Sequence, residues 1–373
     1  IKTEPAKQRD LFLSVIVPLF SVLLVMIFFY LNSPAYRTPN IDAYAYSYYG
    51  REITRGAVLY RDLADNKGPV LHYLNALGQA LGVDMWGIWL IELVFISLGV
   101  MLISRFMRQK AMLLLPFALM FFLRGFMRRF EGGNLTEEYA VLFFLVIFLL
   151  FWQYVKKQDN HRTLMLAGFV SGLSMLLRGN LISPLIALIS FLTVETFIDK
   201  KVRIGFGRIF LVLAGFLIPF VFFILLFAAQ GALFDFFDQA FFYNFFYSQK
   251  SGQALISSIG WLFRGYTAHM FIAVLCWLVT LYGCVVDNAI LSTAERKLAA
   301  FIVLGYTFEL LLFNLSGRNF PHYALTLLPY EFFLLYFTWL VMKAKIRDFG
   351  FGSIHTGIGA ALVSGLLVLQ AFG

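Results

Sequence analysis

The sequence predicts an all-α protein that crosses a membrane about eleven times, and three features of its composition support this. The apolar fraction is 60%, the charged fraction is 14%, and the mean hydropathy is +0.79 over 373 residues. Soluble domains are about 45–50% apolar and about 25% charged, so a water-soluble fold of this length could not bury so much apolar surface. The 44 Phe and 18 Tyr suit lipid-facing helices and interfacial belts.

Apolar stretches of about the length that spans a bilayer recur along the chain. They cover residues 11–31, 85–104, 111–123, 138–155, 163–177, 181–198, 209–229, 262–284, 298–315, 323–342 and 354–372. Stretches 111–123, 163–177 and 354–372 are short or weakly apolar. Because no internal repeat or low-complexity linker divides the chain, we expect residues 1–373 to form one transmembrane domain.

The distribution of Lys and Arg predicts the orientation of the spans. With the N-terminus in the cytoplasm, every cytoplasmic loop carries at least two basic residues. Topology and contacts with phosphate therefore explain the net charge of +9, and no nucleic-acid partner is expected. Cys276 and Cys284 are the only cysteines and lie in one apolar span, so neither a disulfide framework nor a zinc site is predicted.

The first extracytoplasmic loop, residues 32–84, is far longer than a connector needs to be. Residues 41–55 and 69–82 both carry apolar residues at helical spacing, and Pro69 suits the first turn of a helix. Each segment is too short to span, so we expect two amphipathic helices that lie on the membrane surface. The charged turn LYRDLADNKGP, residues 59–69, joins them.

Residues 234–247, FDFFDQAFFYNFFY, also read as interfacial, because polar residues interrupt the apolar run. We favour a plain interfacial anchor here over a segment that closes on a lipid substrate.

The extracytoplasmic loops contain the groups needed to transfer a sugar from a lipid phosphate. The departing phosphate needs positive charge, and the acceptor hydroxyl needs one carboxylate to take its proton. A divalent cation could help but is not demanded. Asp42 is placed at the membrane surface, at the start of the first surface helix. An acid that only interacts with the helix dipole is an equally good interpretation.

Basic residues are frequent in these loops, against the usual bias of charge. The candidates are Lys67, Arg124, Arg128, Arg129, Arg178, Arg318 and His322. Arginine meets phosphate with a paired fork of donors, so the cluster at 124–129 suits phosphate. A loop stabilised by ion pairs with Glu131 would explain the same cluster equally well.

Three of the basic candidates have individual alternatives. Arg178 stands between two apolar spans with almost no loop, and an arginine so close to hydrocarbon usually has a partner or a ligand. Lys67 follows two aspartates and could form an ion pair that contributes little when exposed. His322 could donate to phosphate or only extend towards water at the end of its span.

Four glutamates lie in or near the spans. Glu137 and Glu138 begin the span at 138–155, and pairing with the arginines is favoured over a role towards the acceptor. Glu309 and Glu331 lie within spans, where carboxylates are functional candidates by default. Protonated, hydrogen-bonded structural groups would explain the latter two as well.

The run NIDAYAYSYYGREITRGAVLYRDLADNKGPVLHYLNAL, residues 40–77, resembles the first external loop of glycosyltransferases of the GT-C fold. It is most similar to the bacterial branch related to protein O-mannosyltransferases and to the aminoarabinose transferase of lipid A. The segments NLTEEYA, LLRGN and GRNFPHYALTLLP also look like that group, so the similarity covers at least residues 40–330. The chain departs by NKGP in place of a doubled proline, and it shows no soluble C-terminal domain, which leaves acceptor recognition open.

The resemblance implies an enzyme of the bacterial plasma membrane that uses a polyprenyl-phosphate sugar on the extracytoplasmic face and inverts the anomeric centre. Asp42 matches the catalytic acid of the family, and Lys67 matches a basic residue near the donor phosphate. Arg178, Arg318 and His322 fall where further phosphate-binding groups would be expected.

The sequence therefore predicts an inverting glycosyltransferase whose acceptor is a glycan, lipid or protein hydroxyl. Residues expected to line the groove or face the acceptor are Tyr44, Tyr60, Asp65, Glu137, Glu138 and Tyr323. The alternative is a transporter or flippase of polyprenyl-linked sugars, which would explain Glu309 and Glu331. It predicts internal repeats that the sequence lacks, and it gives the long first loop no purpose. A non-catalytic membrane scaffold would leave the extracytoplasmic arginines unexplained.

Overall fold

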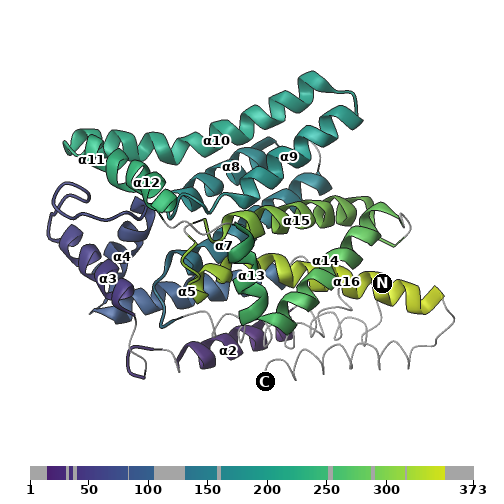
Figure 1. Ribbon diagram of the computed structural model, residues 1–373, viewed down its shortest axis with the longest axis horizontal. Helices are drawn as coiled ribbons and strands as arrows, with labels where there is room; N and C mark the ends of the chain where they lie inside the picture. The colour runs from purple at the N-terminus through teal and green to yellow at the C-terminus, as the bar shows by residue number, and fades with distance from the viewer. Residues whose placement is uncertain are drawn as a thin grey trace.

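The computed structural model describes residues 15–30, 33–36, 40–82, 84–104, 131–157, 161–250, 255–286, 290–315 and 317–348. Within these ranges the regular elements are helices and no strand forms (Figure 1). The longer ones run beside one another as a bundle, and α3, α4 and α11 gather at one end of it (Figure 1).

The helices of the described residues are joined by connections of unequal length. In chain order they are α2 (Val17–Tyr30), α3 (Ile41–Thr54), α4 (Pro69–Leu81), α5 (Met85–Ser104), α7 (Thr136–Lys156), α8 (His161–Met175), α9 (Ser183–Ile198), α10 (Val202–Ala229), α11 (Leu233–Phe237), α12 (Tyr243–Lys250), α13 (Leu255–Gly265), α14 (Thr267–Val285), α15 (Thr293–Leu312) and α16 (Leu328–Asp348). A π-helical turn, η3 (Asp238–Phe242), joins α11 to α12, and a 3-10 turn, η4 (Pro321–Leu327), leads into α16.

Four helical stretches among the described residues are long and apolar enough to cross a membrane. They are α5, α7, α10 and the continuous run Pro321–Lys345. The pair α13 and α14, bent by 110°, would make a fifth span if it counts as one. These stretches are compatible with a helical membrane protein. They do not establish the predicted total of about eleven spans, and the ranges 111–123 and 354–372 lie outside the described residues.

Several predicted helical ranges agree closely with the structure, and two need correction. The range 85–104 coincides with α5, whereas α10 begins at Val202, well before the expected 209. The early start places Arg208 on the helix, where it pairs with Glu195 of α9 at 3.3 Å. The expected span 262–284 is broken at Tyr266, whose backbone angles (φ −137°, ψ 40°) leave the helical region between α13 and α14.

Glycines bring α8 and α10 into close contact. A Cβ on Gly168 would lie 2.0 Å from the carbonyl oxygen of Val212, and one on Gly172 would lie 2.4 Å from that of Phe216. A Cβ on Gly215 would likewise lie 1.9 Å from the carbonyl oxygen of Met165. Small residues that let backbones approach are typical of helix pairs in membranes, where packing rather than water drives association.

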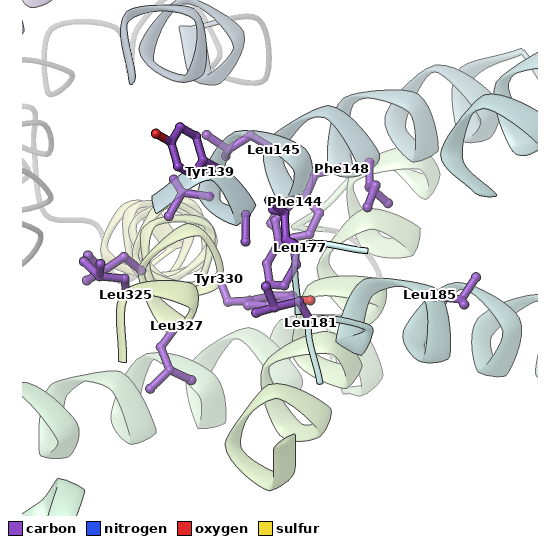
Figure 2. Close-up of a cluster of buried hydrophobic side chains, with 14 of the residues drawn as sticks. Tyr139, Phe144, Leu145, Phe148, Leu177, Leu181, Leu185, Leu325, Leu327 and Tyr330 are labelled. Atoms are coloured by element: carbon purple, nitrogen blue, oxygen red, sulfur yellow. The ribbon is translucent and has the colours of Figure 1, made fainter. Parts of the chain in front are cut away.

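A buried hydrophobic cluster lies beneath the connection between α8 and α9 (Figure 2). Leu177 and Leu181 of this connection are almost fully buried, as is Tyr330 of α16. The ring of Tyr330 lies 4.9 Å from that of Phe148 on α7. Residue 178 therefore stands between two anchored leucines, so its side chain has a rigid base.

The two surface helices of the first loop form where they were predicted. Asn40 caps α3 by accepting a hydrogen bond from the amide of Ala43 at 2.9 Å, and Pro69 occupies the first turn of α4. On α4, His72 and Asn75 are buried while Leu77 is exposed, and on α3 Tyr44 is exposed together with Asp42. An outward apolar side is what a helix on a lipid surface requires.

Candidate active site

The turn of residues 59–69 has an internal framework of hydrogen bonds. Tyr60 takes a positive φ of 70°, and its amide donates to the carbonyl of Leu63 at 2.9 Å. Its hydroxyl donates to the carbonyl of Lys67 at 2.7 Å, and the Asp65 carboxylate accepts from the amide of Lys67 at 3.0 Å. Tyr60 is buried and supports the turn from within, and its expected place in a groove stays a prediction.

Main-chain bonds fix this turn to the end of α8. The amide of Gly68 donates to the carbonyl of Leu177 at 3.0 Å, and the amide of Val70 donates to that of Leu176 at 3.1 Å. A Cβ on Gly68 would lie 2.0 Å from the Leu176 carbonyl oxygen, so only glycine permits this approach. Lys67 is thereby delivered next to Arg178, although 111 positions separate them in sequence.

Arg178 is held between an acid and an aromatic ring. It forms an ion pair with Glu137, whose side chain is only 2% exposed at the start of α7. The guanidinium also lies over the ring of Tyr323 from η4, at 4.0 Å from the ring centre. Burial alone would lower the pKa of Arg178, but the Glu137 charge outweighs it and the pKa is raised, so the guanidinium stays charged.

Lys67 lies at the centre of several charges. Burial lowers the pKa of its amine, and the neighbouring Arg178 charge lowers it further, whereas Asp65, Glu137 and Asp42 act in the opposite sense. Its Nζ donates to the Asn66 side chain at 3.2 Å. The acid and the two bases that the sequence singled out therefore act on one another at a single end of the bundle.

Asp42 is exposed in the first turn of α3, near enough for its charge to act on Tyr46 and Lys67. Tyr46 lies one turn further along α3 and is buried; burial first, and then the charges of Asp65 and Asp42, raise the pKa of its hydroxyl. Tyr46 was not among the residues expected at the site, although its spacing of four residues from Asp42 could have indicated it. Tyr44 is exposed on another side of the helix.

His322 joins the same region through a different acid. Its Nδ1 forms a hydrogen bond with the Glu131 carboxylate, its ring stacks on that of Phe320 with the ring centres 5.5 Å apart, and it meets the ring of Tyr323 edge-on. The sequence suggested Glu131 as a partner of the arginine cluster, but in the structure Glu131 contacts this histidine. Arg318 is exposed near the start of η4. Arg124, Arg128 and Arg129 lie outside the described residues.

Glu138 lies apart from its neighbour Glu137. Its carboxylate accepts from the amide of Asn134 at 3.0 Å and interacts with Glu92 of α5. Asn134, buried and with φ 60°, donates to the carbonyl of Ala43 and exchanges hydrogen bonds with Asn75. Glu138 therefore belongs to the junction of α3, α4, α5 and α7, and its expected role towards an acceptor stays a prediction.

His72 is a further residue that the sequence did not single out for chemistry. It is fully buried, its Nε2 lies 3.6 Å from the Asp65 carboxylate, and the rings of Tyr46 and Tyr49 meet it edge-on. Burial lowers its pKa to about 4, so the ring is neutral at pH 7. The burial of His72 could not be predicted, because spacing along one helix does not show which side of that helix turns inward.

The carboxylates of Glu309 and Glu331 both have hydrogen-bond partners inside the bundle. Glu309 accepts from the hydroxyls of Ser183 and Thr326, and Glu331 lies 2.6 Å from Nε2 of His269. Within the described parts of the chain, no group of three or more His, Cys, Asp or Glu is arranged to hold a metal ion.

In chemical terms, the site offers an exposed carboxylate at Asp42, whose charge acts on the Lys67 amine, and a guanidinium at Arg178 whose charge acts on the same amine. Such a set can bind an anion such as phosphate and accept a proton next to it. Comparisons of the chain with family models, with curated proteins and with solved structures find no match.

Proposed function

We propose that this protein is an inverting glycosyltransferase of the GT-C type that moves a sugar from a polyprenyl phosphate to a hydroxyl acceptor. The reaction would occur at the extracytoplasmic face of a bacterial plasma membrane. The observation that carries the proposal is the convergence of Asp42, Lys67 and Arg178, from α3, the 59–69 turn and the α8–α9 connection, at one end of an apolar helical bundle.

The proposed reaction assigns a role to each of these groups. The acceptor oxygen attacks the anomeric carbon as its proton passes to Asp42, and the bond from that carbon to the phosphate oxygen breaks. The phosphate leaves with the electron pair, and Lys67 and Arg178 stabilise the charge that develops on it. Their positions are set before the donor arrives, which favours the transition state.

Other residues have supporting roles in the proposal. Glu137 and Tyr323 orient Arg178, and Asp65 holds the Lys67 backbone. Further phosphate contacts are assigned to His322, Arg318, Arg124, Arg128 and Arg129. The donor and the membrane lipid are the expected partners, together with a glycan, lipid or protein acceptor.

A transfer assay with purified protein in lipid nanodiscs tests the proposal. A labelled polyprenyl-phosphate sugar is supplied with candidate hydroxyl acceptors, and product is followed by chromatography. Asp42→Asn should abolish transfer and leave donor binding largely intact, because the phosphate contacts remain. Asp62→Asn is the matched control, since that carboxylate is also exposed in the first loop but is occupied by Arg61 and the amide of Val58. Unchanged turnover by Asp42→Asn would remove Asp42 from its role.

One observation favours the second candidate, a transporter or flippase of polyprenyl-linked sugars. The Nε2 atom of His269 lies 2.6 Å from the Glu331 carboxylate, next to the break between α13 and α14. Broken helices with ionisable residues occur at the coupling sites of secondary transporters. Reconstituted protein that moves labelled lipid between leaflets without making product would favour this candidate.

A further inference from the structure

The segment from α11 to α12 has two chemically different sides. Phe234, Phe242 and Phe245 are 88%, 58% and 61% exposed, as suits contact with lipid. Gln239 and Asn244 are turned the other way, towards the 59–69 turn. The predicted interfacial anchor therefore carries a second, polar face that meets the protein.

Gln239 bridges two points of the turn with one amide group. Its oxygen accepts from the amide of Asp65 at 3.0 Å, and its nitrogen donates to the carbonyl of Tyr60 at 2.7 Å. Asn244 donates to the carbonyl of Asn66 at 2.5 Å. A side-chain amide is the neutral group that both donates and accepts at a fixed spacing, so it suits a backbone site with one free donor and one free acceptor.

These contacts fall on the residues directly before Lys67. From the opposite side, Gly68 and Val70 are bonded to the end of α8. Lys67 is thus enclosed by backbone contacts on both sides, whereas its own side chain donates only to the adjacent Asn66 among the described residues. Its position depends on how firmly the turn is held.

We propose that Gln239 and Asn244 are positioning residues that hold the Lys67 turn against α8, so that the aromatic interfacial segment sets the place of the donor-phosphate base. The part that concerns phosphate rests on the proposed function. The mechanical part, that the Gln239 amide restrains residues 60–66, stands on the hydrogen bonds alone.

Hydrogen exchange tests the mechanical part without any ligand. In Gln239→Leu, exchange of the Asp65 amide should accelerate about tenfold or more, because its acceptor is lost. The amide of Gly68, bonded to Leu177, should stay protected. Gln239→Glu keeps an acceptor for Asp65 and loses the donor to Tyr60, so it should show an intermediate rate. Asp238→Asn, an exposed neighbour, is the matched control and should leave exchange unchanged.

Kinetics in a double-mutant cycle test the link to Lys67. Gln239→Leu should raise the KM for the lipid-linked donor about tenfold and change kcat less, since a displaced base weakens donor binding. In the Lys67→Ala background the same substitution should add almost nothing, because both changes act through one amine. Thermal unfolding of each variant separates this effect from a general loss of folding.

The possible results separate the two proposals. Unchanged exchange at Asp65 in Gln239→Leu would overturn the inference whatever the enzyme does. Accelerated exchange with no transfer by the wild-type protein would keep the restraint and remove the proposed function. Additive losses from Gln239→Leu and Lys67→Ala would show that Gln239 does not act through Lys67, and would overturn its positioning role.

Discussion

The guanidinium of Arg178 lies over the ring of Tyr323, with its central carbon 4.0 Å from the ring centre. The two residues come from the α8–α9 connection and from η4, so the contact joins segments far apart in the chain. Contact through the aromatic face leaves the edge of the guanidinium available to pair with Glu137.

The Tyr323 side chain meets Arg178 through its ring face and also through its hydroxyl, and two variants separate these contributions. Tyr323→Phe keeps the ring beneath Arg178 and loses only the hydroxyl, so it should change donor KM and the unfolding temperature less than removal of the ring does. Tyr323→Leu removes a cation–π contact of about 0.5–2 kcal/mol and should raise donor KM several-fold. Parallel transfer assays and thermal unfolding measure both variants, and equal behaviour of the two would contradict a role for the ring.

The buried ion pair predicts a large loss of stability. Glu137→Gln leaves the Arg178 charge without its partner, which should cost about 3–5 kcal/mol of unfolding free energy. Glu52→Gln, which removes the partner of the exposed Arg55, is the control and should have a much smaller effect. Thermal unfolding in a mild detergent compares the two, and similar shifts would argue against a buried, tightly paired Glu137.

The approach of the 59–69 turn to α8 predicts a position-specific effect of alanine. Gly68→Ala brings a methyl group into the Leu176 carbonyl, so the turn must move and the bond to Leu177 must lengthen or break. We expect a loss of about 1–3 kcal/mol together with a drop in transfer. Gly179→Ala, whose Cβ would meet no atom within 4 Å, should change neither.

His72 predicts acid sensitivity of folding. Its pKa is about 4 when folded and near 6.5 when unfolded, so the unfolded chain takes up a proton first as the pH falls. The contribution of this residue is thus present above about pH 6.5 and is lost progressively down to about pH 4, in total about 3 kcal/mol. Asp65, Lys67, Tyr46 and Tyr49 face the ring and set this environment.

His72→Phe isolates that effect. The ring nitrogens make no hydrogen bond, so the replacement loses none and keeps the edge contacts with the two tyrosines. Unfolding temperatures measured from pH 7 to pH 4 should decline less steeply for the variant than for the wild type. Parallel declines would place the acid sensitivity elsewhere.

Local patterns in the sequence predicted where helices form, but not which residues contact one another across helices. Periodicity and a proline located α3, α4 and α5 almost to the residue, because each depends on neighbours within a turn. The pairing of Arg178 with Glu137 spans 41 positions, and that of Gln239 with Asp65 spans 174. Such contacts depend on how helices pack, which spacing along one helix does not record.

The same limit explains Glu138 and His72. Glu138 was expected to pair with the arginines or to face an acceptor, and His72 was not singled out. The structure buries both: Glu138 accepts a hydrogen bond from the amide of Asn134, whereas His72 lies between Tyr46 and Tyr49 and its ring nitrogens make no hydrogen bond. Which side of α3 and of α4 is buried becomes clear only once these helices are placed on the bundle.

Residues 68–70 are joined to the carbonyls of Leu176 and Leu177 by backbone hydrogen bonds rather than by side chains. These backbone hydrogen bonds therefore do not depend on which side chain stands at position 67, provided that residue 68 is glycine. Evolution or a designer could exchange the amine for a shorter, neutral or acidic group while the scaffold persists. The charge presented at this end of the bundle would then be adjustable at one codon, separately from the stability of the chain.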